Sequence, residues 1–301
     1  MLICDTHADT LFAMTKGAKD TDISLDRLQK AHVSLQTLAL FVGRKESPEK
    51  IRQHFEDMIA CRDVLLSQGW IQVSDPRDIT EDKSCFMLSI EGCEAFEGGL
   101  DSISMWRNRG VRMAAICWNW ENDLAFPAAI DQQKGLKPYG KEAVREMLRL
   151  GIAPDVSHLS DRGFWDLLEM GAIPLASHSC CRALCGHFRN LTDEQLKNLF
   201  ARGGYVGVNF YPSFLDESGR ASLDRLCDHF IHMMEMGGEG KIGFGSDFDG
   251  IETKVPGLEN PLGLKGLMAQ LKKRGLTDKQ IEGIAGQNLL DYYDRIFPRK
   301  V

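Results

Sequence analysis

Short runs of apolar and β-branched residues recur along the chain and alternate with longer stretches whose apolar residues follow helical spacing. The runs that predict strands cover residues 2–4, 35–42, 85–90, 111–118, 152–156, 173–176, 205–210 and 241–244. The stretches that predict helices include residues 48–67, 140–150, 161–170, 193–201 and 221–236. Short apolar runs are typical of buried strands, whereas apolar positions three and four residues apart are typical of helices.

This alternation of strands and helices predicts parallel β/α units. Because eight such strands are predicted, we expect an α/β fold with a closed (β/α)8 barrel of the TIM type. Residues 262–273, 278–285 and 287–296 predict additional C-terminal helices. A barrel of this kind takes roughly 250 residues as one unit, and no segment has the composition of a linker. We therefore expect residues 1–301 to form a single domain.

Composition and charge narrow the class of protein. The 36 basic and 43 acidic residues give a net charge of -7, which provides no basic surface for nucleic acid. No apolar run reaches the roughly 18 residues of a membrane span, and the first residues lack the pattern of a signal peptide. The nine cysteines are scattered without paired spacings, which favours a reducing compartment. We expect a cytoplasmic protein that binds neither nucleic acid nor membrane.

Polar residues follow many of the predicted strands at the point where the strand ends. They are His7 and Asp9 after the first run, Glu91 after the third, His158 after the fifth, His178 after the sixth and Asp247 after the eighth. Barrel enzymes carry their sites at the carboxyl ends of the strands. Imidazoles and carboxylates are zinc ligands, and a carboxylate can bridge two metals. The set predicts a metal centre in which Asp247 has the position of a general acid/base, although each histidine alone could equally be structural.

Other polar residues have more ordinary interpretations. We expect His32, His54, His229 and His232 in helices, whereas His187 lies in the loop beside Arg189 and either lines the pocket or packs locally. We interpret Cys180, Cys181 and Cys185 as packing residues. The glycines of residues 243–250 do not complete a phosphate-binding pattern. Asp249 is expected to be an ordinary loop carboxylate that caps the next segment.

At the strand-end residues the sequence resembles the membrane dipeptidase, or renal dipeptidase, family of zinc peptidases, which belongs to the wider amidohydrolase group of barrels. The resemblance covers nearly the whole chain and rests on the following motifs: Asp5-Thr6-His7-Ala8-Asp9, Ile90-Glu91-Gly92, Gly110-Val111-Arg112, Asp155-Val156-Ser157-His158, Ser177-His178-Ser179, Arg189-Asn190, Val208-Asn209-Phe210-Tyr211, residues 243–250 and Gly286-Gln287-Asn288-Leu289. The chain looks like the shorter bacterial members of that family.

The resemblance implies a role for each site residue. It places His7 and Asp9 on one zinc ion and His158 and His178 on a second, with Glu91 bridging the two. It gives Asp247 the handling of protons, Arg189 the terminal carboxylate of a dipeptide, and Tyr211 a substrate contact. It also implies tolerance of a D-residue at the C-terminal position of the dipeptide. An ion pair with Asp193 or Glu194 is the alternative for Arg189, and a homodimer is one possible assembly.

One position departs from the family pattern. Better-known members have a histidine after the Gly-Val-Arg segment that contacts the scissile group, whereas this chain has Trp118. The indole could donate in its place, Asn119 or Asn122 could take over, or zinc alone could bear the charge. We favour a role for Trp118 in the pocket wall, where it would limit substrate size.

Two other functions remain open from the sequence. The same metal centre could hydrolyse N-acyl amino acids, because the barrel itself does not select the substrate. A barrel that binds a ligand without catalysis is the alternative from a different class.

Overall fold

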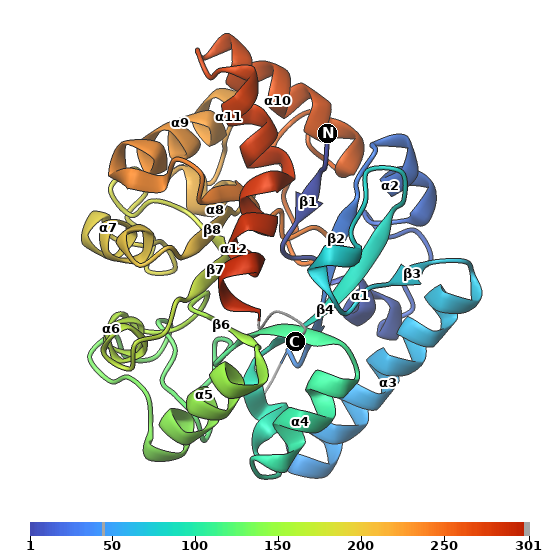
Figure 1. Ribbon diagram of the computed structural model, residues 1–301, viewed down its shortest axis with the longest axis vertical. Coiled ribbons are helices and arrows are strands. Elements are labelled where there is room, and N and C mark those ends of the chain that lie inside the picture. Colours follow the sequence, from blue (N-terminus) through green and yellow to red (C-terminus); the bar gives the residue numbers. More distant parts are fainter. Residues whose placement is uncertain (44–45, 298–301) are drawn as a thin grey trace.

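The computed structural model describes residues 1–43 and 46–297 (Figure 1). The strands among these residues are β1 (Cys4–Asp5), β2 (Leu35–Phe41), β3 (Ile71–Gln72), β4 (Cys85–Glu91), β5 (Val111–Ala115), β6 (Ala153–Asp155), β7 (Leu175–Ser179), β8 (Tyr205–Val208) and β9 (Ile242–Phe244). The helices are α1 (Thr10–Thr15), α2 (Leu25–Lys30), α3 (Pro48–Ser67), α4 (Asp101–Asn108), α5 (Pro138–Leu150), α6 (Asp161–Glu169), α7 (Asp193–Ala201), α8 (Pro212–Leu215), α9 (Leu223–Met233), α10 (Leu264–Lys273), α11 (Asp278–Glu282) and α12 (Asn288–Ile296).

Eight of the strands in the described part of the chain form a closed parallel barrel. Their order is β2-β1-β9-β8-β7-β6-β5-β4, and the pairing of β2 with β4 completes the circuit. The strands run parallel because helical connections return the chain to the same end of the barrel each time. The TIM-type fold predicted from the sequence is confirmed. The two-residue strand β3, which pairs with the start of β4, was not predicted.

Local sequence signals explain several helix ends. At the start of α7 the Thr192 hydroxyl accepts from the backbone N–H of Gln195, whose side chain accepts from the backbone N–H of Thr192. This reciprocal pair satisfies two N–H groups that a helix start leaves unpaired. Gly151 ends α5 in the left-handed conformation, at a φ of 66°, which glycine adopts without a steric penalty.

The predicted strand 111–118 is too long at its C-terminal end. The strand β5 stops at Ala115, and the carbonyl of Ile116 instead accepts from Cys93 N and from the Asn122 side chain. Ile116 and Cys117 are nevertheless fully buried, so their apolar character reflects a buried loop. Trp118 consequently lies in the loop after β5 and not at a strand end.

The two ends of the barrel differ. The helix α12 crosses the amino ends of the strands (Figure 1), where Tyr292 and Tyr293 are buried with Tyr205 in an apolar cluster. That end of the barrel is therefore closed, and the loops at the opposite end are left to form a site. No helix among the described residues is long and apolar enough to cross a membrane.

Candidate metal centre

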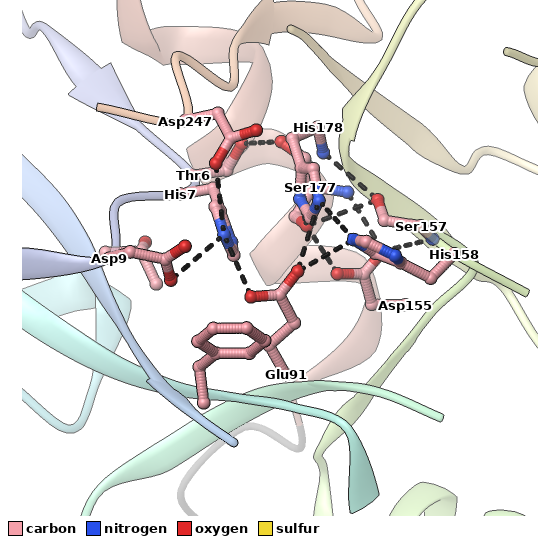
Figure 2. Close-up of polar contacts among 12 residues, drawn as sticks. Thr6, His7, Asp9, Glu91, Asp155, Ser157, His158, Ser177, His178 and Asp247 are labelled. Atoms are coloured by element: carbon pink, nitrogen blue, oxygen red, sulfur yellow. Dashed lines mark hydrogen bonds and ion pairs between the residues drawn. The ribbon is translucent and has the colours of Figure 1, made fainter. Parts of the chain in front are cut away.

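The carboxyl ends of the strands bring together the six polar residues selected from the sequence. His7 and Asp9 follow β1, Glu91 is the last residue of β4, His158 follows β6, His178 lies in β7, and Asp247 follows β9. Figure 2 shows Glu91 between His7 on one side and the pair His158 and His178 on the other. Side chains from five different strands or strand ends thus converge at one place.

Glu91 presents its two carboxylate oxygens to different histidines. Its Oε1 atom lies 2.8 Å from His158 Nε2 and 3.4 Å from His178 Nε2, and these two nitrogens lie 3.0 Å apart. Its Oε2 atom lies 3.4 Å from His7 Nε2. The Glu91 residue is only 3% exposed. This arrangement has the geometry of a carboxylate that bridges two groups of ligands.

A second group of donors surrounds His7. Its Nε2 atom lies 3.7 Å from Asp9 Oδ1 and 3.8 Å from Asp247 Oδ1. His7 Nε2, Asp9 Oδ1 and Glu91 Oε2 are buried and have no hydrogen-bond partner among the described residues, although buried polar atoms are normally paired. The donors of a tetrahedral zinc ion with bonds of about 2.0–2.1 Å lie roughly 3.3–3.4 Å apart. The spacing and chemistry of these donors fit divalent metal ions.

The charges of the site also favour cations. The pKa of the Asp9 carboxyl is raised well above its usual value by burial and by the neighbouring Glu91, and burial raises the pKa of Asp247 to about 6 against the opposing influence of His7. Burial lowers the pKa of His7, but Glu91, Asp9 and Asp247 outweigh burial and raise it to about 10. Shifts of this kind reflect negative charge concentrated in a buried space, which metal ions would neutralise.

The rings of His158 and His178 are held from their Nδ1 atoms. His158 Nδ1 lies 2.9 Å from Asn119 Oδ1, and His178 Nδ1 lies 2.7 Å from Ser177 Oγ. Burial lowers the pKa of His158 to about 3 and that of His178 well below its usual value. Neutral imidazoles with an occupied Nδ1 are typical of metal ligands that bind through Nε2.

The backbone at two of these residues adopts an unfavourable conformation. His158 has a φ of 71° and Asp247 a φ of 65°, in the left-handed region that costs a residue other than glycine on the order of 1–3 kcal/mol. Such strain is concentrated at functional sites. The nearby Asp249 accepts from the Thr10 hydroxyl and from Asp22 N, each at 2.6 Å. It therefore binds a loop distant in sequence, whereas the sequence had predicted that it caps the following segment.

A cleft of about 370 Å³ adjoins the cluster and contains all three predicted substrate contacts, Arg189, Trp118 and Tyr211. Its wall also contains Phe12, Phe41 and Phe214, which were not predicted from the sequence. The Phe41 ring packs edge-on against Phe12 and Trp118, with ring centroids 4.8 and 4.7 Å away. Phe41 is the last residue of β2, and Phe12 lies in α1, the helix that follows β1. These positions near strand ends could have indicated that the two side chains line the site.

Arg189 is buried at the edge of this cleft. One of its terminal nitrogens lies 3.0 Å from His178 Nε2, and its Nε atom has no hydrogen-bond partner among the described residues. The contacts of the described residues include no ion pair of Arg189 with Asp193 or Glu194, and Asp193 instead contacts His232 at 2.8 Å. The alternative of a structural ion pair for Arg189 therefore loses its support.

The remaining candidates have structural surroundings. The ring of His187 lies 4.4 Å from Phe188 and 4.5 Å from Phe214, measured between centroids, which is local packing. Asn122 binds backbone groups of its own loop, so of the two asparagines considered only Asn119 lines the cleft. His54, His229 and His232 lie in helices, whereas His32 lies in the turn after α2.

Known proteins share this fold and sequence pattern. Residues 1–296 match the sequence family described as Membrane dipeptidase (Peptidase family M19). An uncharacterized dipeptidase of Schizosaccharomyces pombe is 36% identical over 216 residues, which are 69% of this chain and 52% of that protein. An uncharacterized protein of Klebsiella pneumoniae is 33% identical over 232 residues, which are 73% of this chain and 85% of that protein. The chain spans about half the length of the fungal relative.

Solved structures show the same barrel. A metallo peptidase from Rhodobacter sphaeroides, liganded with a phosphinate mimic of the dipeptide L-Ala-D-Ala, superposes with a TM-score of 0.91 at 22% identity and covers 99% of both chains. The probable dipeptidase PvdM from Pseudomonas aeruginosa has a TM-score of 0.89 at 21% identity, over 98% of this chain and 95% of that one. At these identities the likeness concerns the fold alone, whereas the sequence match extends from the first residue to the last helix. The chain belongs to the membrane dipeptidase family of peptidases.

Proposed function

We propose that the protein is a zinc-dependent dipeptidase that hydrolyses the peptide bond of free dipeptides. The observation that carries the proposal is the buried cluster around Glu91, whose two oxygens face His7 on one side and His158 and His178 on the other. Membership of the membrane dipeptidase family supports the same reaction.

We assign His7 and Asp9 to one zinc ion and His158 and His178 to a second, with Glu91 as the bridge. Bound metals of this kind supply a nucleophile near neutral pH by lowering the pKa of water to about 7, and they polarise the scissile carbonyl. The protein's own contribution is a buried, preorganised set of donors, several of whose atoms find no hydrogen-bond partner in the described part of the chain and would be satisfied by cations.

Asp247 is the proposed general acid/base. Its Oδ2 atom accepts from Asn209 Nδ2 at 3.0 Å, which orients the carboxylate, and Oδ1 faces the metal-ligand cluster. Burial raises the pKa of this carboxyl above its usual value, which increases its affinity for a proton and suits a group that transfers one. It would take a proton from the attacking water and deliver it to the leaving amine.

Arg189 is the proposed binding group for the dipeptide's terminal carboxylate. It lines the cleft beside His178, and its Nε–H has no partner within residues 1–43 and 46–297. A guanidinium binds a carboxylate with two parallel hydrogen bonds. A carboxylate held this close to the ligand cluster leaves room for a single residue beyond the scissile bond. The cleft should therefore favour dipeptides over longer peptides, with Trp118 and Tyr211 as its walls.

We further propose that a D-residue is accepted at the C-terminal position. The family resemblance suggests it, and the Rhodobacter sphaeroides structure contains a mimic of L-Ala-D-Ala.

The test combines metal analysis of the purified protein with a screen of dipeptides in both configurations at each residue, and N-acyl amino acids serve as the comparison. We expect two zinc ions per chain and hydrolysis that requires a free amino terminus. A metal-replete protein that cleaves only N-acyl amino acids, or cleaves none of these compounds, would contradict the proposal.

A further inference from the structure

A chain of buried hydrogen bonds connects the ring of His178 to Asp155. His178 Nδ1 contacts Ser177 Oγ at 2.7 Å, and the Ser177 hydroxyl in turn donates to Asp155 Oδ2 (Figure 2). All three residues are at most 3% exposed. Neither Asp155 nor Ser177 has a place in the reaction proposed above, so their burial beside a metal-ligand candidate requires an explanation.

The contacts of Asp155 determine the direction of this chain. Its Oδ1 atom accepts from the backbone N–H groups of Ser157 at 2.8 Å and Ser177 at 3.0 Å. Burial raises the pKa of Asp155, but the Ser177 hydroxyl donates to its Oδ2 atom as well, and three accepted hydrogen bonds favour the ionised carboxylate, which can only accept. The single hydroxyl proton of Ser177 therefore points to Asp155, and the Ser177 oxygen is left to accept the proton of His178 Nδ1.

The contacts of Ser157 agree with this direction. Its hydroxyl oxygen accepts from the backbone N–H of His178 at 3.1 Å and lies 3.3 Å from Ser177 Oγ. Its own proton can then be donated to the second lone pair of Ser177 Oγ. Every donor and acceptor in the set has a partner when His178 carries its proton on Nδ1.

The contact of Arg189 with the other ring nitrogen of His178 indicates the same tautomer. A terminal nitrogen of Arg189 lies 3.0 Å from His178 Nε2, and a guanidinium can donate but not accept. This contact favours an unprotonated His178 Nε2, which is the form that binds a metal ion. The other neighbours of Nε2, Glu91 Oε1 and His158 Nε2, are assigned to the same metal centre.

We propose that Asp155 and Ser177 are positioning residues that fix the Nδ1-protonated tautomer of His178 and so prepare Nε2 to bind zinc. The inference rests on the proposed assignment of His178 as a metal ligand. Asp155 also joins the loop that carries His158 to the strand β7 that carries His178, because it accepts from backbone on both.

The tautomers of His158 and His178 are fixed by different kinds of partner at Nδ1. His158 Nδ1 faces the side-chain oxygen of Asn119, and a carbonyl oxygen can only accept. A hydroxyl, by contrast, can donate or accept. Ser177 can therefore pair with either tautomer of His178, and Asp155 makes it an acceptor by taking the hydroxyl proton, in agreement with the Arg189 contact at Nε2.

The test measures the His178 tautomer directly in the metal-free full-length protein by 15N NMR of the imidazole nitrogens, with the resonance assigned by its loss in His178→Gln. In the unmodified chain we expect the proton on Nδ1. Ser177→Ala removes the acceptor of the Nδ1 proton and should reduce the population of the Nδ1-protonated form, which the Arg189 contact alone then supports. Asp155→Asn places an N–H against Ser177, which reverses the hydroxyl and should shift the His178 proton toward Nε2 against the opposing Arg189 contact.

A matched control is Asp5→Asn. Asp5 is also a buried aspartate at the end of a strand, and it accepts from the backbone of His7 and Ser246 without contacting a histidine ring. This variant should leave the His178 tautomer unchanged. A general effect of neutralising a buried aspartate would instead alter the tautomer in both variants and overturn the proposal.

Zinc affinity provides the second readout, measured by competition with a chelating dye. Loss of a group that orients a metal-bound histidine typically weakens metal binding about 10- to 100-fold, and we expect this for Ser177→Ala. Unchanged zinc affinity and an unchanged His178 tautomer in Ser177→Ala would refute the positioning role of Asp155 and Ser177. Neither the NMR measurement nor the zinc affinity involves a dipeptide. Failure of this positioning role can therefore be distinguished from failure of the proposed dipeptidase activity.

Discussion

The substitution Asp247→Asn tests whether Asp247 transfers protons or binds a metal ion. Asp247 and Asp9 lie almost equally far from His7 Nε2, at 3.8 and 3.7 Å. Their side chains are also similarly buried, at 13% and 9% exposure. Distance and burial alone therefore do not tell the two carboxylates apart, and the spacing of Asp247, Asp9 and His7 would itself suit a metal ion.

The hydrogen bonding of Asp247 leads us to expect a catalytic role. Because Asn209 donates to one Asp247 oxygen, the asparagine side chain of Asp247→Asn should turn its own carbonyl oxygen to Asn209 and its amide N–H groups to the cluster. An amide there cannot accept a proton from water. General acid/base groups contribute about 10²- to 10⁴-fold to the rate, so kcat should fall by that factor, equivalent to about 2.7–5.5 kcal/mol of barrier.

The assay pairs kcat on a free dipeptide with the metal content of the same sample. Asp9→Asn is the matched variant, and it should lose zinc because Asp9 is an assigned ligand. Asp247→Asn should retain both ions and lose turnover. If Asp247→Asn instead lost zinc as Asp9→Asn does, or kept its turnover, the assignment of proton transfer to Asp247 would be refuted.

Three further substitutions test the other roles. Glu91→Gln should weaken zinc binding at both positions together, since a neutral amide is a poor bridge, and two tightly bound ions with normal turnover would exclude the bridging role. Arg189→Ala should lower kcat/KM for free dipeptides about 10- to 100-fold, in line with charge-assisted hydrogen bonds of about 1.5–3 kcal/mol, and affect dipeptide amides much less; equal losses on both would argue against carboxylate binding. Trp118→Phe should keep kcat within a few fold and change the preference among dipeptide side chains, because Trp118 packs on Phe41 in the cleft wall; a hundredfold loss of kcat with metals retained would make the indole N–H an oxyanion donor.

Much of the fold and the position of the cluster could be predicted from the chain. The eight apolar runs corresponded to the barrel strands, and predicted helices such as 48–67 and 193–201 match α3 and α7 residue for residue. The reason is physical: parallel barrel strands all end on the same face, so a polar residue after each strand must point to a common region.

The apolar pattern did not predict the end of a strand correctly where buried residues lie in a loop. The apolar run that ends at Trp118 looked like strand throughout, yet its last residues form a buried loop whose carbonyl of Ile116 binds other loops. A buried position favours an apolar residue in a loop as much as in a strand. The spacing of apolar residues alone therefore could not locate the end of β5.

The sequence by itself determined the residue types at the strand ends, and with them the chemistry open to the site. Only the tertiary structure decided which atoms face one another: that the Glu91 oxygens divide between His7 and the other two histidines, and that Asp155 reaches His178 through Ser177. Such contacts join distant parts of the chain, as do Asp5 and Ser246, which are 241 positions apart and share a hydrogen bond. No local pattern encodes them, because they depend on how the closed barrel sets the height and rotation of each strand relative to its neighbours.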